Sequence, residues 1–189
     1  MKHNVASIRT RADLLEAIGH GLNPEYLHFW GHRVPRDGSL TRSCLSQWYP
    51  ARFCIEGVTY PTAEHYMMTS KARLFEDREA EEKILAAPDP NAAKKLGRRV
   101  KNYDDGAWKR RRYEAVVEGN LAKFGQNERL GQFLAATADR ILVEASPVDT
   151  IWGIGLSAEH PDAANPLKWR GLNLLGFALM ETREQLSNQ

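Results

Sequence analysis

The chain is poor in several features that would mark a particular class of protein. Cys44 and Cys54 are its only cysteines among 189 residues, too few for the disulfide framework of a secreted domain. No apolar run approaches the roughly 18 residues of a membrane span, and residues 1–11 lack the apolar core of a signal peptide. With a net charge of +2, the chain has no general basic field that would draw it to nucleic acid. We therefore expect a reduced, cytoplasmic protein that does not bind a membrane.

Signatures of metal and phosphate-loop sites are also missing. The six histidines are scattered, and no cluster of cysteine and histidine has the spacing of zinc ligands. The glycine pair Gly153 and Gly155 is not followed by the Gly-Lys-Ser/Thr of a phosphate loop. We expect neither a metal nor an organic cofactor.

Apolar spacing and turn residues predict a helix-rich α+β fold with a few short strands in a single main domain. Residues 1–24 are expected to form a polar arm and a short accessory helix, and residues 25–189 the main domain. Glu56-Gly57 is the expected turn of a hairpin, and residues 149–155 are expected to be a strand end and a glycine loop. Strands are expected at 26–30, 53–55, 58–60 and 141–144, and helices at 11–21, 62–75, 77–87, 89–100, 104–124, 127–137 and 172–186.

Glu64 and Lys71 mark the helix expected after Thr62, its predicted N-cap. They are seven residues apart, which is about two turns, so they lie near one face of the helix. The helix dipole favours an ionised Glu64, whereas burial among aromatic neighbours would raise its pKa. Two interpretations are open at this point, an ion-paired surface face or a polar site set into the core.

Asp149 follows the apolar strand at 141–144 and precedes Trp152 by three residues. It is either a turn residue or, paired in space with Glu64, the second carboxylate of a glycosidase-like site. The glycines that follow allow backbone N–H groups to approach a ligand closely, although Gly-x-Gly is also common in turns.

Trp108 lies in the first turn of the longest expected helix and is followed by four consecutive cations, Lys109 to Arg112. The tryptophan is either a core anchor or a platform on which a base or sugar ring stacks. Most of the four cations must be solvated, because they point in all directions around the helix. One of them, Arg112, is the candidate for binding a substrate phosphate.

Taken in chain order, these segments resemble one known family, the NADAR family of YbiA-like N-glycosidases associated with NAD and ADP-ribose. The resemblance covers about residues 26–186 and is carried by the order of its motifs. They are Phe29-Trp30-Gly31, Leu45-Ser46-Gln47-Trp48-Tyr49-Pro50, the 53–60 hairpin, Thr62-Ala63-Glu64-His65-Tyr66-Met67-Met68, Lys71-Ala72-Arg73-Leu74-Phe75, Trp108, Asp149-x-x-Trp152-Gly153-Ile154-Gly155 and Gly171-Leu172-Asn173-Leu174-Leu175-Gly176.

The resemblance implies hydrolysis of an N-glycosidic bond to a ribose that carries phosphate. The implied substrates are phosphoribosylamino pyrimidine intermediates of riboflavin biosynthesis, or ADP-ribose on guanine bases, in which case ADP-ribosylated nucleic acid is the substrate. Two departures from the family pattern bear on substrate choice: residues 67–70 replace a glutamine-containing stretch, and the 157–169 loop and N-terminal helix look like additions. The family motifs map active-site positions onto Glu64, Lys71, Trp108, Asp149, Trp152, Gly153 and Asn173.

The expected chemistry assigns a role to each group. Glu64 and Asp149 flank the anomeric carbon, where one protonates the leaving nitrogen and the other activates water or stabilises charge on the ribose. Lys71 either acts as a cation or forms a Schiff base with the ring-opened sugar, and the substrate base stacks on Trp48 or Trp108. The alternative is a sensor module that binds ADP-ribose or a nucleotide without cleaving it.

Overall fold

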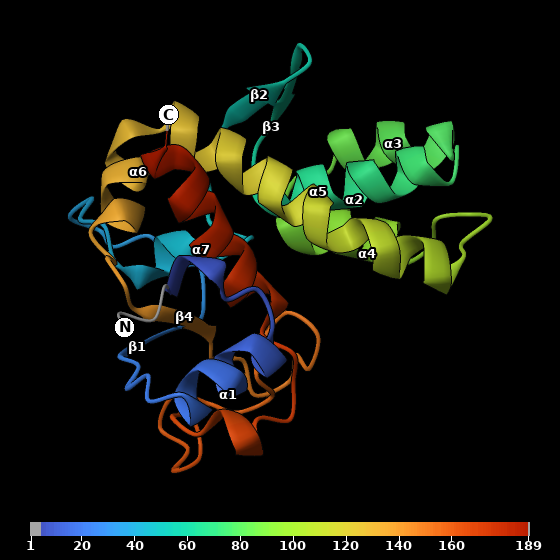
Figure 1. Cartoon of the computed structure of the whole chain (residues 1–189). Helices are drawn as coiled ribbons and strands as arrows, with labels where there is room; N and C mark the ends of the chain where they lie inside the picture. Colours follow the sequence, from blue (N-terminus) through green and yellow to red (C-terminus); the bar gives the residue numbers. More distant parts are fainter. Residues whose placement is uncertain (1–4, 189) are drawn as a thin grey trace.

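The computed structural model describes residues 5–188 and confirms a helix-rich α+β architecture. Figure 1 shows the helices α2, α3 and α4 gathered on one side of the long helix α5, and the strands β1 and β4 on the other side beneath α7. The elements are η1 (Val5–Ser7), α1 (Arg11–Gly19), β1 (Tyr26–Phe29), η2 (Arg42–Leu45), β2 (Phe53–Ile55), β3 (Val58–Tyr60), α2 (Ala63–Leu74), α3 (Arg78–Leu85), α4 (Pro90–Gly97), α5 (Asp105–Gln126), α6 (Glu128–Ala135), β4 (Ile141–Glu144), η3 (Pro166–Lys168) and α7 (Leu174–Ser187).

The strands form two separate pairs. β2 and β3 form the expected antiparallel hairpin, with Glu56 and Gly57 at positive φ in its turn. β1 and β4 pair in parallel, although more than a hundred residues separate them, and their register sets Phe29 opposite Glu144. This pairing brings the loop that follows β1 next to the end of β4, which is where the candidate site lies.

Helix α7 covers the β1–β4 pair and also packs on α5. Its approach to β4 is so close that a Cβ at Gly176 would lie 2.0 Å from the carbonyl oxygen of Leu142. Asn173 precedes the helix in a left-handed conformation, with φ of 56°. The large apolar core therefore runs through the contacts of β4, α7 and α5.

Four helices begin where their capping residues predict. Thr62 caps α2, and aspartates accept a backbone hydrogen bond at the start of α3, α4 and α5. The glycine loop differs from its expectation: within the described part of the chain, residues 149–155 form turns and no strand end. The reason is that Asp149 and its neighbours direct their backbone groups into local turns, for example from Gly155 N to Asp149 O at 3.1 Å.

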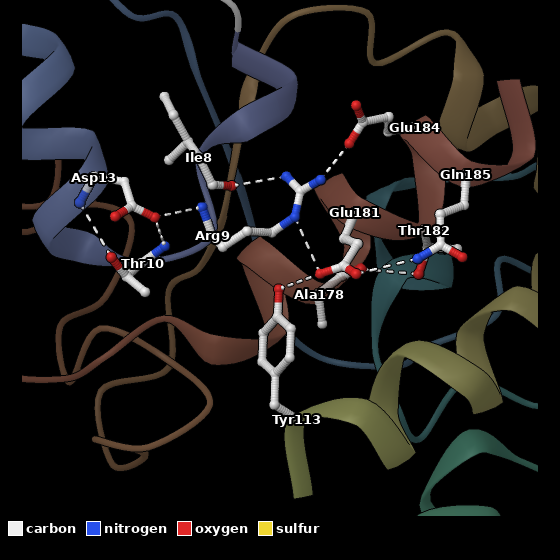
Figure 2. A network of polar contacts seen from close by, with 10 residues as sticks. All are labelled: Ile8, Arg9, Thr10, Asp13, Tyr113, Ala178, Glu181, Thr182, Glu184 and Gln185. Atoms are coloured by element: carbon white, nitrogen blue, oxygen red, sulfur yellow. Dashed lines mark hydrogen bonds and ion pairs between the residues drawn. The ribbon is translucent and has the colours of Figure 1, made fainter. Parts of the chain in front are cut away.

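The N-terminal segment packs on the same body as the rest of the chain. Val5 and Ile8 are buried, which differs from the polar arm that the sequence predicts for residues 1–10; the first four residues of that arm lie outside the described part. Figure 2 shows Arg9 between Glu181 and Glu184 of α7, with an ion pair of 3.1 Å from its Nε to Glu181. The division into an accessory segment of 1–24 and a domain of 25–189 stays a prediction.

None of the helices within residues 5–188 is long and apolar enough to cross a membrane.

Candidate active site

A cavity of about 660 Å³ opens where the loop after β1, the segment after η2, helix α4 and the end of β4 meet. This volume is typical of small-molecule sites. Another hollow of about 430 Å³, between α5, α6 and α7, contains one carboxylate and one arginine and no converging acids. The larger cavity is lined by Trp30, Gly31, His32, Arg33, Ser46, Trp48, Lys94, Glu144, Ser146, Val148 and Asp149.

Glu64 lies just behind this lining, at the second position of α2. Its side chain is only 2% exposed, and burial raises its pKa to about 7, against the attraction of Lys94 and a hydrogen bond from the Trp48 side chain. The negative charge of Asp149 raises the pKa further, and the charge of Arg98 lowers it. Although Glu64 does not line the cavity, it interacts electrostatically with three residues that do: Trp48, Lys94 and Asp149.

Asp149 lines the cavity and also forms a turn. Its Oδ1 accepts hydrogen bonds from the backbone N–H groups of Ile151 at 2.9 Å and Trp152 at 2.7 Å. Its own N–H donates to the Ser146 hydroxyl at 3.2 Å. The two interpretations of this residue from the sequence are therefore compatible, because the turn holds the carboxylate at the cavity.

Glu144 is a third carboxyl at the same place, at the last position of β4. Its Oε2 is buried, and no described residue provides it with a hydrogen bond. Burial raises the pKa of Glu144 to about 8; repulsion from Asp149 and, more weakly, Glu64 adds to this effect, and the attraction of Lys94 opposes it.

Three of the expected site residues hold the strand and loop behind the cavity. Asn173 is fully buried; its Oδ1 accepts from the backbone N–H of Glu144 at 2.9 Å, and its Nδ2 donates to Leu142 O at 2.9 Å. Gly153 packs so closely that a Cβ there would lie 2.8 Å from Glu144 O. Trp152 is partly buried and packs on the core. A direct contact of these three with substrate stays a prediction.

Lys71, Trp108 and Arg112 lie outside the cavity lining. The Lys71 amine donates to Gly97 O at 2.8 Å and lies 4.2 Å from the ring centroid of Tyr103 and 5.9 Å from that of Trp108. Burial lowers the pKa of Lys71, and the charge of Arg98 lowers it further.

Trp108 is 7% exposed and packs in the core. Arg112 lies near the start of α5, where its charge acts on Tyr103 and Asp105.

Arg98 is the link between the two groups of residues, because its charge acts on both Glu64 and Lys71. Glu64 and Lys71 both lie in α2, two helical turns apart, and form no ion pair with each other. Their roles in catalysis stay a prediction.

The family model of the NADAR domain matches residues 28–187. This chain belongs to the NADAR family. N-glycosidase R617 of Acanthamoeba polyphaga mimivirus is 43% identical to it over 146 residues, which cover 75% of this chain and 86% of that protein. N-glycosidase YbiA of Escherichia coli strain K12 is 33% identical over 133 residues, covering 70% and 74%.

The solution structure of E. coli YbiA has the same fold, with a TM-score of 0.69 and 28% identity over 88% of each chain. A protein of Vibrio vulnificus named riboflavin biosynthesis protein VVA0006 is 33% identical over 142 residues, which are 75% of this chain but 35% of that protein. This NADAR chain therefore spans about a third of the length of that relative.

Sequence reasoning missed several residues that line the cavity of this NADAR protein. Lys94 lies over the Trp48 ring, with its Nζ 5.6 Å from the ring centroid, and the His32 ring lies 5.4 Å from the same ring. Trp30 is 61% exposed at the rim. Its place in the Phe29-Trp30-Gly31 motif was a signal that could have found it, whereas Glu144 resembles an ordinary strand end in the sequence.

Proposed function

We propose that this NADAR protein hydrolyses the N-glycosidic bond of a phosphorylated ribosyl compound. The enzyme class rests on its relatives: R617, which aligns with this chain over most of its length, and YbiA are both named N-glycosidases. By this relationship the chain is a hydrolase acting on N-glycosyl bonds. The observation that carries the proposal is that Glu144 and Asp149 line one cavity, with Glu64 close enough behind the lining to interact with both.

Carboxyls in different protonation states are what hydrolysis of a glycosidic bond requires. An amine or base leaves a ribose poorly unless a proton is donated to its nitrogen. The positive charge that develops on the ribose needs an ionised carboxylate nearby, which also takes a proton from the attacking water. Asp149 fits the second role by its position, since two backbone N–H groups donate to its Oδ1 and hold the side chain at the cavity.

The remaining lining supports a ligand with a flat ring and a phosphate. Trp30 and Trp48 offer aromatic faces on which a base can stack. Lys94 and Arg33 place positive charge in the same cavity as the carboxyls. A phosphorylated ribosyl compound matches this arrangement, with its phosphate at the cations and its anomeric carbon at the carboxyls.

A product assay tests the proposal. The purified protein is offered phosphoribosylamino pyrimidines and DNA carrying ADP-ribosylated guanosine side by side, and release of the free base is measured. We expect the protein to cleave one of these two classes of compound. Asp149→Asn should lower the rate of base release by a factor on the order of 10² or more. Tight binding of either compound without any cleavage would instead indicate the sensor module.

The same assay decides the role of Lys71. Borohydride added during turnover traps a Schiff base if the Lys71 amine attacks the opened sugar. We expect no adduct, because this amine is bonded to Gly97 O at 2.8 Å and lies outside the cavity lining. A trapped adduct at Lys71 would establish the covalent route.

A further inference from the structure

Glu144 is the group at the cavity that neither the expected site nor the relatives' names assign, and its surroundings distinguish it from the other two carboxyls. We propose that Glu144 is the proton donor of the reaction, a catalytic residue that delivers its proton to the nitrogen leaving the ribose. This inference rests on the proposed N-glycosidase function.

The first argument is the hydrogen bonding of the three carboxyls. Two backbone N–H groups donate to Asp149, and Glu64 lies at a helix N-terminus beside the Trp48 side chain, although its own Oε1 is buried without a partner among the described residues. No residue in the described range donates to the carboxyl of Glu144, and its Oε2 is buried without a partner. Mutual repulsion disfavours ionisation of all three neighbouring acids. Glu144 is the one in the cavity lining to which no described residue donates, so it holds the proton.

The second argument is position. Glu144 lines the cavity, whereas Glu64 lies behind the lining. The main chain of Glu144 is fixed from two sides, because its N–H donates to Asn173 Oδ1 at 2.9 Å and its carbonyl accepts from Ile154 N at 2.9 Å. Strand pairing with β1 holds it from a third direction. These contacts fix the backbone from which the carboxyl projects, and a positioned side chain is what proton transfer in a transition state requires.

The step balances without a further reactant. The bond between the anomeric carbon and the nitrogen breaks, and its electron pair stays on the nitrogen, which takes the proton from the Glu144 carboxyl. Water forms the new bond to the anomeric carbon and gives a proton to the Asp149 carboxylate. Exchange with solvent then returns a proton to Glu144 and removes one from Asp149.

Other charged groups at the cavity set the pH at which this works. Glu64 on α2 and Asp149 in the loop after β4 disfavour a charged Glu144, and Lys94 on α4 favours it. His32 and Arg33, from the loop after β1, line the same cavity. The acid is therefore expected to be protonated at neutral pH and to lose its proton near pH 8.

The test compares two leaving groups on the same ribosyl phosphate. A neutral aminopyrimidine needs a proton in order to leave, whereas the pyridinium nicotinamide leaves as a neutral molecule without one. For Glu144→Gln we expect kcat/KM to fall about 10²–10⁴-fold on the amine substrate and less than about tenfold on nicotinamide mononucleotide. The alkaline limb of the pH profile should disappear in the variant. Glu159→Gln, an exposed glutamate in the following loop, is the matched control.

Equal losses on the two substrates, or an unchanged alkaline limb, would overturn the assignment. A second measurement does not depend on turnover: carbon-13 NMR of labelled glutamate carboxyls, with Glu144→Gln to identify the signal. We expect Glu144 to be neutral at pH 7. A Glu144 that is ionised at that pH refutes the proposal even if no substrate is found, whereas a neutral Glu144 without any hydrolysis refutes only the proposed function.

Discussion

Glu64 combines a charge-bearing side chain with almost complete burial, and this combination has a measurable effect on stability. Its pKa is raised from an ordinary value of 4.5 to about 7. Between these two pH values the folded protein therefore binds more protons than the unfolded chain. The contribution of a protonated Glu64 to the free energy of unfolding is fully present below about pH 4.5 and is lost as the pH rises through 7.

We predict that Glu64→Gln removes this loss. The wild-type free energy of unfolding should fall on the order of 3 kcal/mol more than that of the variant between pH 5 and pH 8. Urea unfolding at several pH values measures it, with Glu159→Gln as a control that keeps the wild-type slope. Parallel curves for Glu64→Gln and the wild type would show that Glu64 is not the group that is protonated.

The buried Lys123 is hydrogen-bonded to the end of η2, the short segment that leads into the cavity lining. Its amine, fully buried on α5, donates to Cys44 O at 2.7 Å and Ser46 O at 2.8 Å. Lys123→Met keeps the volume and leaves two carbonyls without this donor, so we predict a loss on the order of 2 kcal/mol in unfolding free energy. Because Ser46 and Trp48 line the cavity, KM should rise as well.

The matched control for Lys123 is Lys95→Met, a change on an exposed face of α4. It should leave both urea unfolding and KM unchanged. An unchanged stability in Lys123→Met would mean that the cost of burying the amine cancels its two hydrogen bonds.

The close packing of helix α7 on strand β4 requires that position 176 has no side chain beyond hydrogen, as Gly176 provides. A Cβ there would meet Leu142 O at 2.0 Å and the Asn173 side chain at 2.5 Å. Gly176→Ala must push the helix off the strand, so we predict a loss of about 1–3 kcal/mol or more in thermal or urea unfolding. Gly19→Ala is the control, since no described atom outside its chain neighbours and its own helix backbone lies within 4 Å of its Cβ position; a similar loss there would mean that the effect is not steric.

Local signals in the sequence predicted the helices and strands themselves better than they predicted which of these elements pack or pair with each other. Thr62 and the hairpin turn at Glu56-Gly57 act within a few residues, so their effect can be read directly from the chain. The pairing of Phe29 with Glu144 joins distant segments and has no local signal. For that reason the sequence pointed to Glu64 and Asp149 but not to Glu144, whose importance arises only from the parallel pair. Lys94 was missed for the same reason, because only the packing of α4 against α2 places it at the cavity.

In the molecule as a whole, the N-terminal segment packs against α7, the last helix of the chain, and against η3. η1 packs on α7, and α1 packs on η3. Arg11 donates to Trp169 O and Leu167 O, each at 2.9 Å. Glu181, which forms an ion pair with Arg9, also accepts a hydrogen bond of 3.0 Å from Tyr113 of α5 (Figure 2). The ion pairs of Arg9 are partly exposed and contribute little by themselves. The stabilising contact of this segment must therefore be its buried apolar side chains.

Leu14 tests whether the segment belongs to the same cooperative unit. This side chain of α1 is fully buried in the main core, so Leu14→Ala should lower the free energy of unfolding by about 2–5 kcal/mol. If the segment and the domain fold together, circular dichroism and tryptophan fluorescence will report one transition with the same shifted midpoint. Leu167→Ala, at a position that is 69% exposed, is the control and should not move it. A separate early transition confined to circular dichroism, with an unchanged fluorescence midpoint, would instead mean that residues 5–19 dock on an independently stable domain, as the accessory interpretation of the sequence holds.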